Sequence, residues 1–192
     1  MRVASLLIAL FTMVPLHADA GRKAGVTMPE QITVAGKRLS LNGMGLREAT
    51  MLKVNVYVAG LYVERPSSDP AQLINSEQAK VIVLTFVRDV DRGDITKAWS
   101  EGFEHNPVVP HGTVQAEIDQ LNSWMTGMKK GQTMTFTYVP GIGTTVNVAG
   151  KRMGTIQGED FARSLFAIWL GHKPPSSALR KGLLGSHAQA SR

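Results

Sequence analysis

The stretch from Gly43 to Glu64 constrains the fold of this chain most, because it contains a long run of strand-forming residues. Valine, glycine and tyrosine occupy the even-numbered positions from Val54 to Tyr62, whereas the odd-numbered positions include asparagine and Tyr57. This alternation predicts a β-strand with one apolar face and one face that carries polar groups. Arg47 follows two glycines, which predicts an arginine-bearing turn. Because an arginine beside such a strand must pair with an anion or reach water, Arg47 is a first candidate functional residue.

The order of the remaining elements predicts the fold class. The predicted strands are residues 32–34 and 39–41 with a turn at Gly36, the run through Tyr62, residues 80–88, and hairpin arms at 133–139 and 144–149. The predicted helices are residues 71–77, 91–104, a segment that starts at a cap on Thr113, 159–170 and 177–184. Strands, helices, a hairpin and a helix do not form a βαβ alternation. We therefore predict an α+β domain with an antiparallel sheet and helices layered on one side.

One short string occurs twice in the chain. The residues Val-Ala-Gly-Lys-Arg stand at positions 34–38 and again at 148–152. The residues around the two copies do not match. We interpret the string as repeated turn chemistry and not as a domain repeat.

The N-terminus has the pattern of an exported protein. A basic start is followed by an apolar run from Val3 to Leu16 and by Ala18-Asp19-Ala20, which is typical of a signal peptide with its cleavage site. We predict a signal peptide over 1–20, a disordered mature start over 21–30, one domain over 31–185 and a basic C-terminal tail over 186–192. The mature protein is expected to be soluble and periplasmic or secreted.

Composition narrows the classes of function. The 192 residues include no cysteine, which excludes thiol catalysis, Cys-ligated zinc and iron–sulfur clusters. The net charge of +6 favours solubility, or a weak attraction to acidic ligands and anionic membrane surfaces. Nucleic acid is not an expected partner, because the basic residues are scattered and the protein is predicted to be exported.

The sequence offers few groups for catalysis or metal binding. The histidines after the predicted signal peptide are His105, His111, His172 and His187, and their spacing does not match a metal site. No G-x-S-x-G motif supports serine hydrolysis. The three tryptophans lie on predicted helix faces that favour burial. We therefore predict no metal, no cofactor and no catalytic residue of these kinds, and Arg47 and Tyr57 remain as the candidate site.

Several strings in the chain resemble the chalcone isomerase-like superfamily, and in particular its bacterial exported branch. The matching strings, in the order of the family, are Gly45-Leu46-Arg47, residues 56–62, Phe86 to Val90, residues 138–144, Ile168 to Gly171, and Leu183-Leu184-Gly185. The resemblance implies an open-faced β-sandwich, in which helices cover one side of a large antiparallel sheet. This agrees with the fold class predicted from the order of the elements.

The superfamily contains isomerases that close a chalcone to a flavanone and non-catalytic members that bind fatty acids. The isomerases use a threonine, an arginine, a tyrosine and an asparagine. Alignment on the family strings places Tyr57 at the threonine, and Ile95 and Gly102 near the tyrosine and asparagine. Neither a tyrosine nor an asparagine lies between Val90 and His105, so the isomerase set is incomplete.

The resemblance therefore favours a non-catalytic binder of a fatty acid or a similar lipophilic carboxylate, with Arg47 and Tyr57 as ligand-binding residues. The apolar tail would lie in a cleft between sheet and helices. One alternative is an isomerase acting on a chalcone-like or other small unsaturated substrate, with Arg47 as electrophile and Tyr57 as proton donor. Another alternative is a structural protein of the cell envelope.

Overall fold

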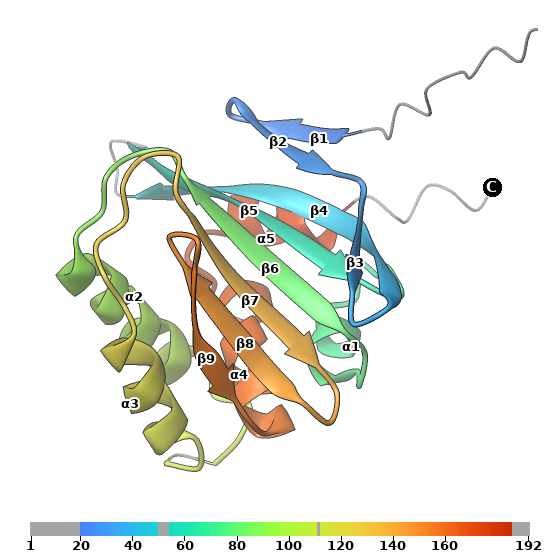
Figure 1. The fold of residues 1–192 in the computed structure, drawn as a ribbon, viewed down its shortest axis with the longest axis vertical. Helices are drawn as coiled ribbons and strands as arrows, with labels where there is room; N and C mark the ends of the chain where they lie inside the picture. Colours follow the sequence, from blue (N-terminus) through green and yellow to red (C-terminus); the bar gives the residue numbers. More distant parts are fainter. Residues whose placement is uncertain (1–19, 50–53, 111, 186–192) are drawn as a thin grey trace, which may run out of the picture.

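A seven-stranded antiparallel sheet forms the centre of the molecule (Figure 1). The computed structural model describes residues 20–49, 54–110 and 112–185. The strands are β3 (Gln31–Val34), β4 (Lys37–Ala49), β5 (Val54–Val63), β6 (Lys80–Phe86), β7 (Thr133–Val139), β8 (Gly143–Val148) and β9 (Lys151–Ile156). They neighbour one another in the order of the chain, so the sheet is a simple meander. The α+β fold with an antiparallel sheet is confirmed.

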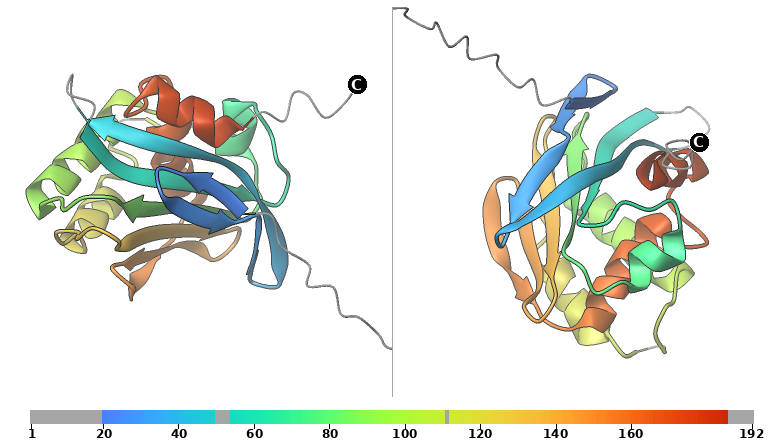
Figure 2. Two further views of the ribbon diagram at one scale, coloured as in Figure 1. Left: turned by 90° about the horizontal axis from the view of Figure 1, so that it is seen from above. Right: turned by 90° about the vertical axis from the view of Figure 1, so that its right-hand side faces the viewer.

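Helices cover one face of the curled sheet (Figure 2). They are α1 (Pro70–Asn75), α2 (Arg92–His105), α3 (Gln115–Ser123), α4 (Glu159–Leu170) and α5 (Ser177–Leu184). The predicted bounds of α4 and α5 are confirmed. Helix α3 begins at Gln115, and its N-cap residue is Val114 rather than the predicted Thr113. The main core lies between sheet and helices, and Trp99 meets Trp169 edge to face there at 5.5 Å. Within the described residues, every helix is too short or too polar to cross a bilayer.

The segment predicted as a disordered start instead forms a hairpin. Strands β1 (Ala20–Lys23) and β2 (Val26–Pro29) pair with each other and form a separate two-stranded sheet. Met28 is buried in a second apolar cluster together with Val58 and Tyr62, on the face of the sheet opposite the helices. Tyr62 also donates its hydroxyl proton to the Pro29 carbonyl oxygen at 2.9 Å. The buried methionine and this hydrogen bond order a segment that composition alone marks as loose. Residues 1–19 of the predicted signal peptide and the tail beyond residue 185 lie outside the described residues.

The repeated string forms the same turn at both of its positions. Ala35 and Gly36 have φ of 48° and 76°, and Ala149 and Gly150 have φ of 51° and 82°. Two consecutive positive φ angles define the tight two-residue hairpin turn that matches strand twist. The second copy joins β8 to β9, a strand that the sequence pattern did not predict. Strand β9 has little apolar alternation, and its Gly154 leaves room for the ring of Trp124.

Two glycines predicted to precede a turn lie instead within β4, where helix α5 rests directly on the strand. A Cβ on Gly43 would collide with backbone carbonyl oxygens of α5, and one on Gly45 with the Leu179 carbonyl oxygen. Asn42 lies at a register shift in β4 and donates to the Leu183 carbonyl oxygen at 2.8 Å. The glycines therefore serve close packing of helix on strand, and Arg47 belongs to the same strand rather than to a turn.

Candidate functional site

Arg47 and Tyr57 are cross-strand neighbours at one end of the β4–β5 pair. The register places Arg47 opposite Tyr57, and the next pair joins Glu48 to Asn55. Val56 is thus an extra residue on β5, which is the signature of a β-bulge. Residues directly opposite each other project their side chains to the same face of the sheet. The fold therefore brings the two predicted site residues together on the face that the helices cover.

Tyr57 is held in place by aromatic neighbours. The side chain is buried, its ring centroid lies 5.7 Å from that of Phe86, and Trp169 Nε1 donates to its hydroxyl oxygen at 3.1 Å. Burial raises the pKa of Tyr57 to about 12, although the hydrogen bond from Trp169 and the charge of Arg47 act in the opposite direction. The phenol is therefore neutral at physiological pH. Its own proton has no acceptor among the described residues, so one donor of the pair is unused.

Arg47 is half-buried and carries its charge next to this neutral phenol. One terminal nitrogen donates to the carbonyl oxygen of Glu48. The four salt bridges found in the described part of the chain do not include Arg47. A guanidinium has five N–H donors in a planar fork, so most of them remain available to a carboxylate.

The prediction that β5 has one polar face is wrong. From Tyr57 to Val63 every residue of the strand is buried. The odd-numbered residues face the main core under the helices, and Val58 and Tyr62 face the cluster around Met28. The hairpin β1–β2 covers the face that would otherwise meet water, which is why the strand is buried on both sides.

The residues at the isomerase positions supply no polar side chain. Ile95 is buried in the main core, and Gly102 on α2 faces Ile168 of α4 so closely that a Cβ would lie 2.7 Å from its Cγ2 atom. Two hollows are described on the surface, one beside α2 and α3 and one beside Tyr138, and neither is lined by Arg47 or Tyr57. The ligand-binding role of the pair thus stays a prediction.

Trp169 is the residue of this site that sequence reasoning missed. Its pattern on α4 predicts core packing, and the residue is indeed fully buried. Its indole N–H nevertheless reaches Tyr57, which lies 112 positions earlier in the chain. No spacing in the sequence indicates a contact of this kind. The one sequence feature that singled out this region was the family string at residues 168–171, which contains Trp169.

The fold and the sequence together define the class of protein. The sequence model of the chalcone isomerase-like family matches residues 20–185, so the chain belongs to this family. Among solved structures, the fold is similar to that of the fatty-acid binding protein AtFAP1 of Arabidopsis thaliana, with a TM-score of 0.69 and 16% sequence identity. The match covers 86% of this chain and 96% of that chain. A search of curated proteins found no matching sequence.

Proposed function

We propose that this protein is a non-catalytic binder of a fatty acid or a similar lipophilic carboxylate, with the head group held by Arg47 and Tyr57. The observation that carries the proposal is the pairing of a half-buried guanidinium with a neutral phenol on one face of the sheet. The guanidinium has no salt-bridge partner in the part of the chain that the structure describes. Family membership and the similarity to a fatty-acid binding protein support the same function.

The chemistry of the pair suits a carboxylate. Arg47 offers a two-pronged, charge-assisted contact, and Tyr57 offers one O–H donor that Trp169 orients. Hydrogen bonds to a charged group contribute about 1.5–3 kcal/mol each. Val56 is partly exposed and packs against the main core beside the pair, so it supplies apolar surface for the start of a tail. Each buried methylene adds about 0.8 kcal/mol.

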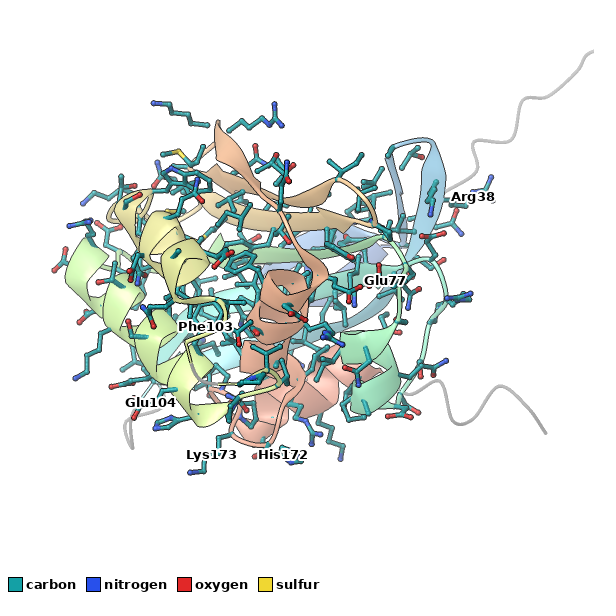
Figure 3. The ribbon with its side chains drawn as sticks, turned by 90° about the horizontal axis from the view of Figure 1, so that it is seen from below. Arg38, Glu77, Phe103, Glu104, His172 and Lys173 are labelled. Carbon is teal, nitrogen blue, oxygen red and sulfur yellow. The ribbon has the colours of Figure 1, made fainter. Side chains whose placement is uncertain are left out.

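Titration of the purified protein with a series of straight-chain fatty acids tests the proposal, with tryptophan fluorescence and calorimetry as readouts. We expect Arg47→Ala to weaken binding about tenfold or more, and Tyr57→Phe to weaken it by a smaller factor. Arg38→Ala is the matched control, because Arg38 lies at the other end of β4, near the β3–β4 turn, and is exposed (Figure 3). Equal affinity of Arg47→Ala and wild type would remove Arg47 from the site. No saturable binding of any fatty acid would refute the proposed function.

We also propose that the protein is exported and cleaved after Ala20. The basic start, the apolar run and the Ala-x-Ala pattern support this. The mass of the protein purified from the periplasmic or secreted fraction is expected to correspond to a chain that begins at Gly21. The net charge of +6 supports a weak contact with anionic lipid surfaces, measurable as salt-sensitive binding to anionic vesicles.

A further inference from the structure

Two methionines interlock the β1–β2 hairpin with the main sheet, on the face opposite the helices (Figure 2). Met28 lies opposite Gly21 within the hairpin, and Met44 lies opposite Gly60 in the β4–β5 ladder. A Cβ on Gly60 would collide with the Met28 Sδ atom, and a Cβ on Gly21 would lie 2.7 Å from the Met44 Sδ atom. Each thioether therefore fills the space above the glycine that faces the other methionine. We call these two methionines and two glycines the methionine lock.

The hairpin depends on this lock because its hydrogen bonds to the main sheet lie at its base. Among the described residues, β1 and β2 pair with each other and form a sheet of their own. The Tyr62 hydroxyl donates to the Pro29 carbonyl oxygen at 2.9 Å. The Leu41 N–H donates to the Glu30 carbonyl oxygen at 2.7 Å. A segment that is anchored at its base and otherwise held by side-chain packing opens locally at a lower free-energy cost than a core strand.

The two methionines differ in their exposure to solvent. Met44 is partly exposed, whereas Met28 is only 4% exposed. An oxidant that arrives from solvent therefore meets Met44 before Met28. Met134 provides an internal reference, because it is fully buried in the main core between sheet and helices.

Oxidation changes the size and polarity of a methionine side chain. One oxygen of hydrogen peroxide bonds to the sulfur, the O–O bond breaks, and the other oxygen leaves as water with both hydrogens. The sulfur loses the two electrons that reduce the peroxide, and the product is a bulkier, polar sulfoxide. In the methionine lock the added oxygen meets a filled apolar space, and burial of an acceptor without a donor is unfavourable. Oxidation therefore opposes the closed position of the hairpin.

We propose that the methionine lock is an oxidation-sensitive switch that releases the β1–β2 hairpin. A peroxide oxidises Met44 first, the loosened hairpin then exposes Met28, and the second sulfoxide keeps the hairpin open. Release uncovers the apolar cluster that contains Val58 on the outer face of the sheet. The Arg47–Tyr57 pair lies on the opposite face, so the switch does not depend on the proposed ligand.

Timed treatment of the purified wild-type protein with hydrogen peroxide tests the proposal. Peptide mass mapping reports the oxidation of each methionine, and hydrogen–deuterium exchange reports the opening of residues 20–29. We expect Met44 to be oxidised about tenfold faster than Met134, because Met134 reacts only after the core opens. Deuterium uptake of the hairpin should rise with oxidation of the lock, while that of α4 stays unchanged. Oxidation of Met44 no faster than Met134, or full oxidation of the lock with unchanged hairpin uptake, would overturn the proposal.

Leucine variants separate the lock from general oxidative damage, because leucine has nearly the volume of methionine and forms no sulfoxide. Met44→Leu is expected to slow the oxidation of Met28 about tenfold, since the first sulfoxide is what loosens the hairpin. The double variant Met28→Leu/Met44→Leu should show no rise of hairpin uptake with peroxide. Met153→Leu is the matched control, because Met153 is also partly exposed but lies on β9 against the main core, and it should respond like wild type.

Two results with these variants would contradict the switch. One is oxidation of Met28 at the wild-type rate in Met44→Leu, and the other is hairpin release by peroxide in the double variant. Treatment of the oxidised wild type with methionine sulfoxide reductases adds a test that needs no variant. Hairpin uptake should return to its initial value once both sulfoxides are reduced, and a hairpin that stays open would show damage rather than a switch.

Discussion

Lys80 on β6 is a buried lysine, and its environment makes the stability of the protein depend on pH in the alkaline range. The residue is 1% exposed, and its Nζ atom donates to the carbonyl oxygens of Leu73 and Ile74 at 2.9 and 2.8 Å, at the end of α1. The same atom lies 5.6 Å from the ring centroid of Tyr138 and 5.5 Å from that of Phe166. Burial lowers the pKa of Lys80 to about 8, which the charge of a nearby glutamate only partly offsets.

The sign of the effect follows from proton binding in the two states. In the unfolded chain a lysine has a pKa of about 10.4, so between the two values the unfolded state binds more protons than the folded state. Stability therefore rises with pH in this window. Each pKa unit corresponds to about 1.4 kcal/mol, and the contribution of Lys80 between about pH 8 and about pH 9.5 is roughly 1–2 kcal/mol. Burial also raises the pKa values of Tyr57 and Tyr62 to about 12, which reduces stability above about pH 10.

Urea unfolding of wild type and of Lys80→Met at these two pH values isolates the effect, because the tyrosines contribute equally to both proteins. We expect the free energy of unfolding of the wild type to gain roughly 1–2 kcal/mol more than that of the variant between the two pH values. Lys97→Met is the matched control, since the Lys97 side chain is 74% exposed on α2, and its pH dependence should equal that of wild type. Parallel pH dependence of wild type and Lys80→Met would refute the reasoning.

Three further substitutions test the packing. Gly45→Ala forces a methyl group against the α5 backbone and should lower the free energy of unfolding by about 1–3 kcal/mol or more. Gly93→Ala is the control, because its methyl group meets open space, and it should be neutral or stabilising. Equal effects of the two substitutions would contradict the close contact between Gly45 and α5. Trp169→Phe loses the hydrogen bond to Tyr57, so its free energy of unfolding, measured with urea, should be about 1–2 kcal/mol lower than that of wild type. A stability equal to that of wild type would mean that this bond contributes nothing. Asn106→Ala loses a donor contact to the Gly102 carbonyl oxygen within α2 and a donor and an acceptor contact with the Lys173 backbone in the loop after α4. Its thermal unfolding midpoint should therefore fall by several degrees, and an unchanged midpoint would count against the importance of these contacts.

Local patterns in the sequence predicted most of the fold. The apolar stripe of α4 and the Ala-Gly turns are encoded within a few residues, and both were predicted. Strand β9 was missed because it lacks alternation. The hairpin β1–β2 was missed because the contacts that order it involve Tyr62, far along the chain. The error about the polar face of β5 has the same origin, since that hairpin covers one side of the strand.

The candidate site was predictable only in part. The family strings singled out Arg47 and Tyr57, but their pairing depends on the register shift between Arg47 and Glu48 in the β4–β5 ladder, and no residue pattern indicates this shift. The hydrogen bond from Trp169 and the contact of α5 with Gly45 join residues more than a hundred positions apart. Such contacts are set by tertiary packing and leave no trace in local periodicity.

The meander has a consequence for synthesis of the chain. Each strand of the sheet pairs with the strand before it, so pairing can advance step by step as residues leave the ribosome. The surroundings of Tyr57 do not follow this order, because Trp169 and helix α5 come after all seven strands of the sheet in the chain. The helix-facing side of the sheet near Arg47 is therefore completed only after helices α4 and α5 have been made.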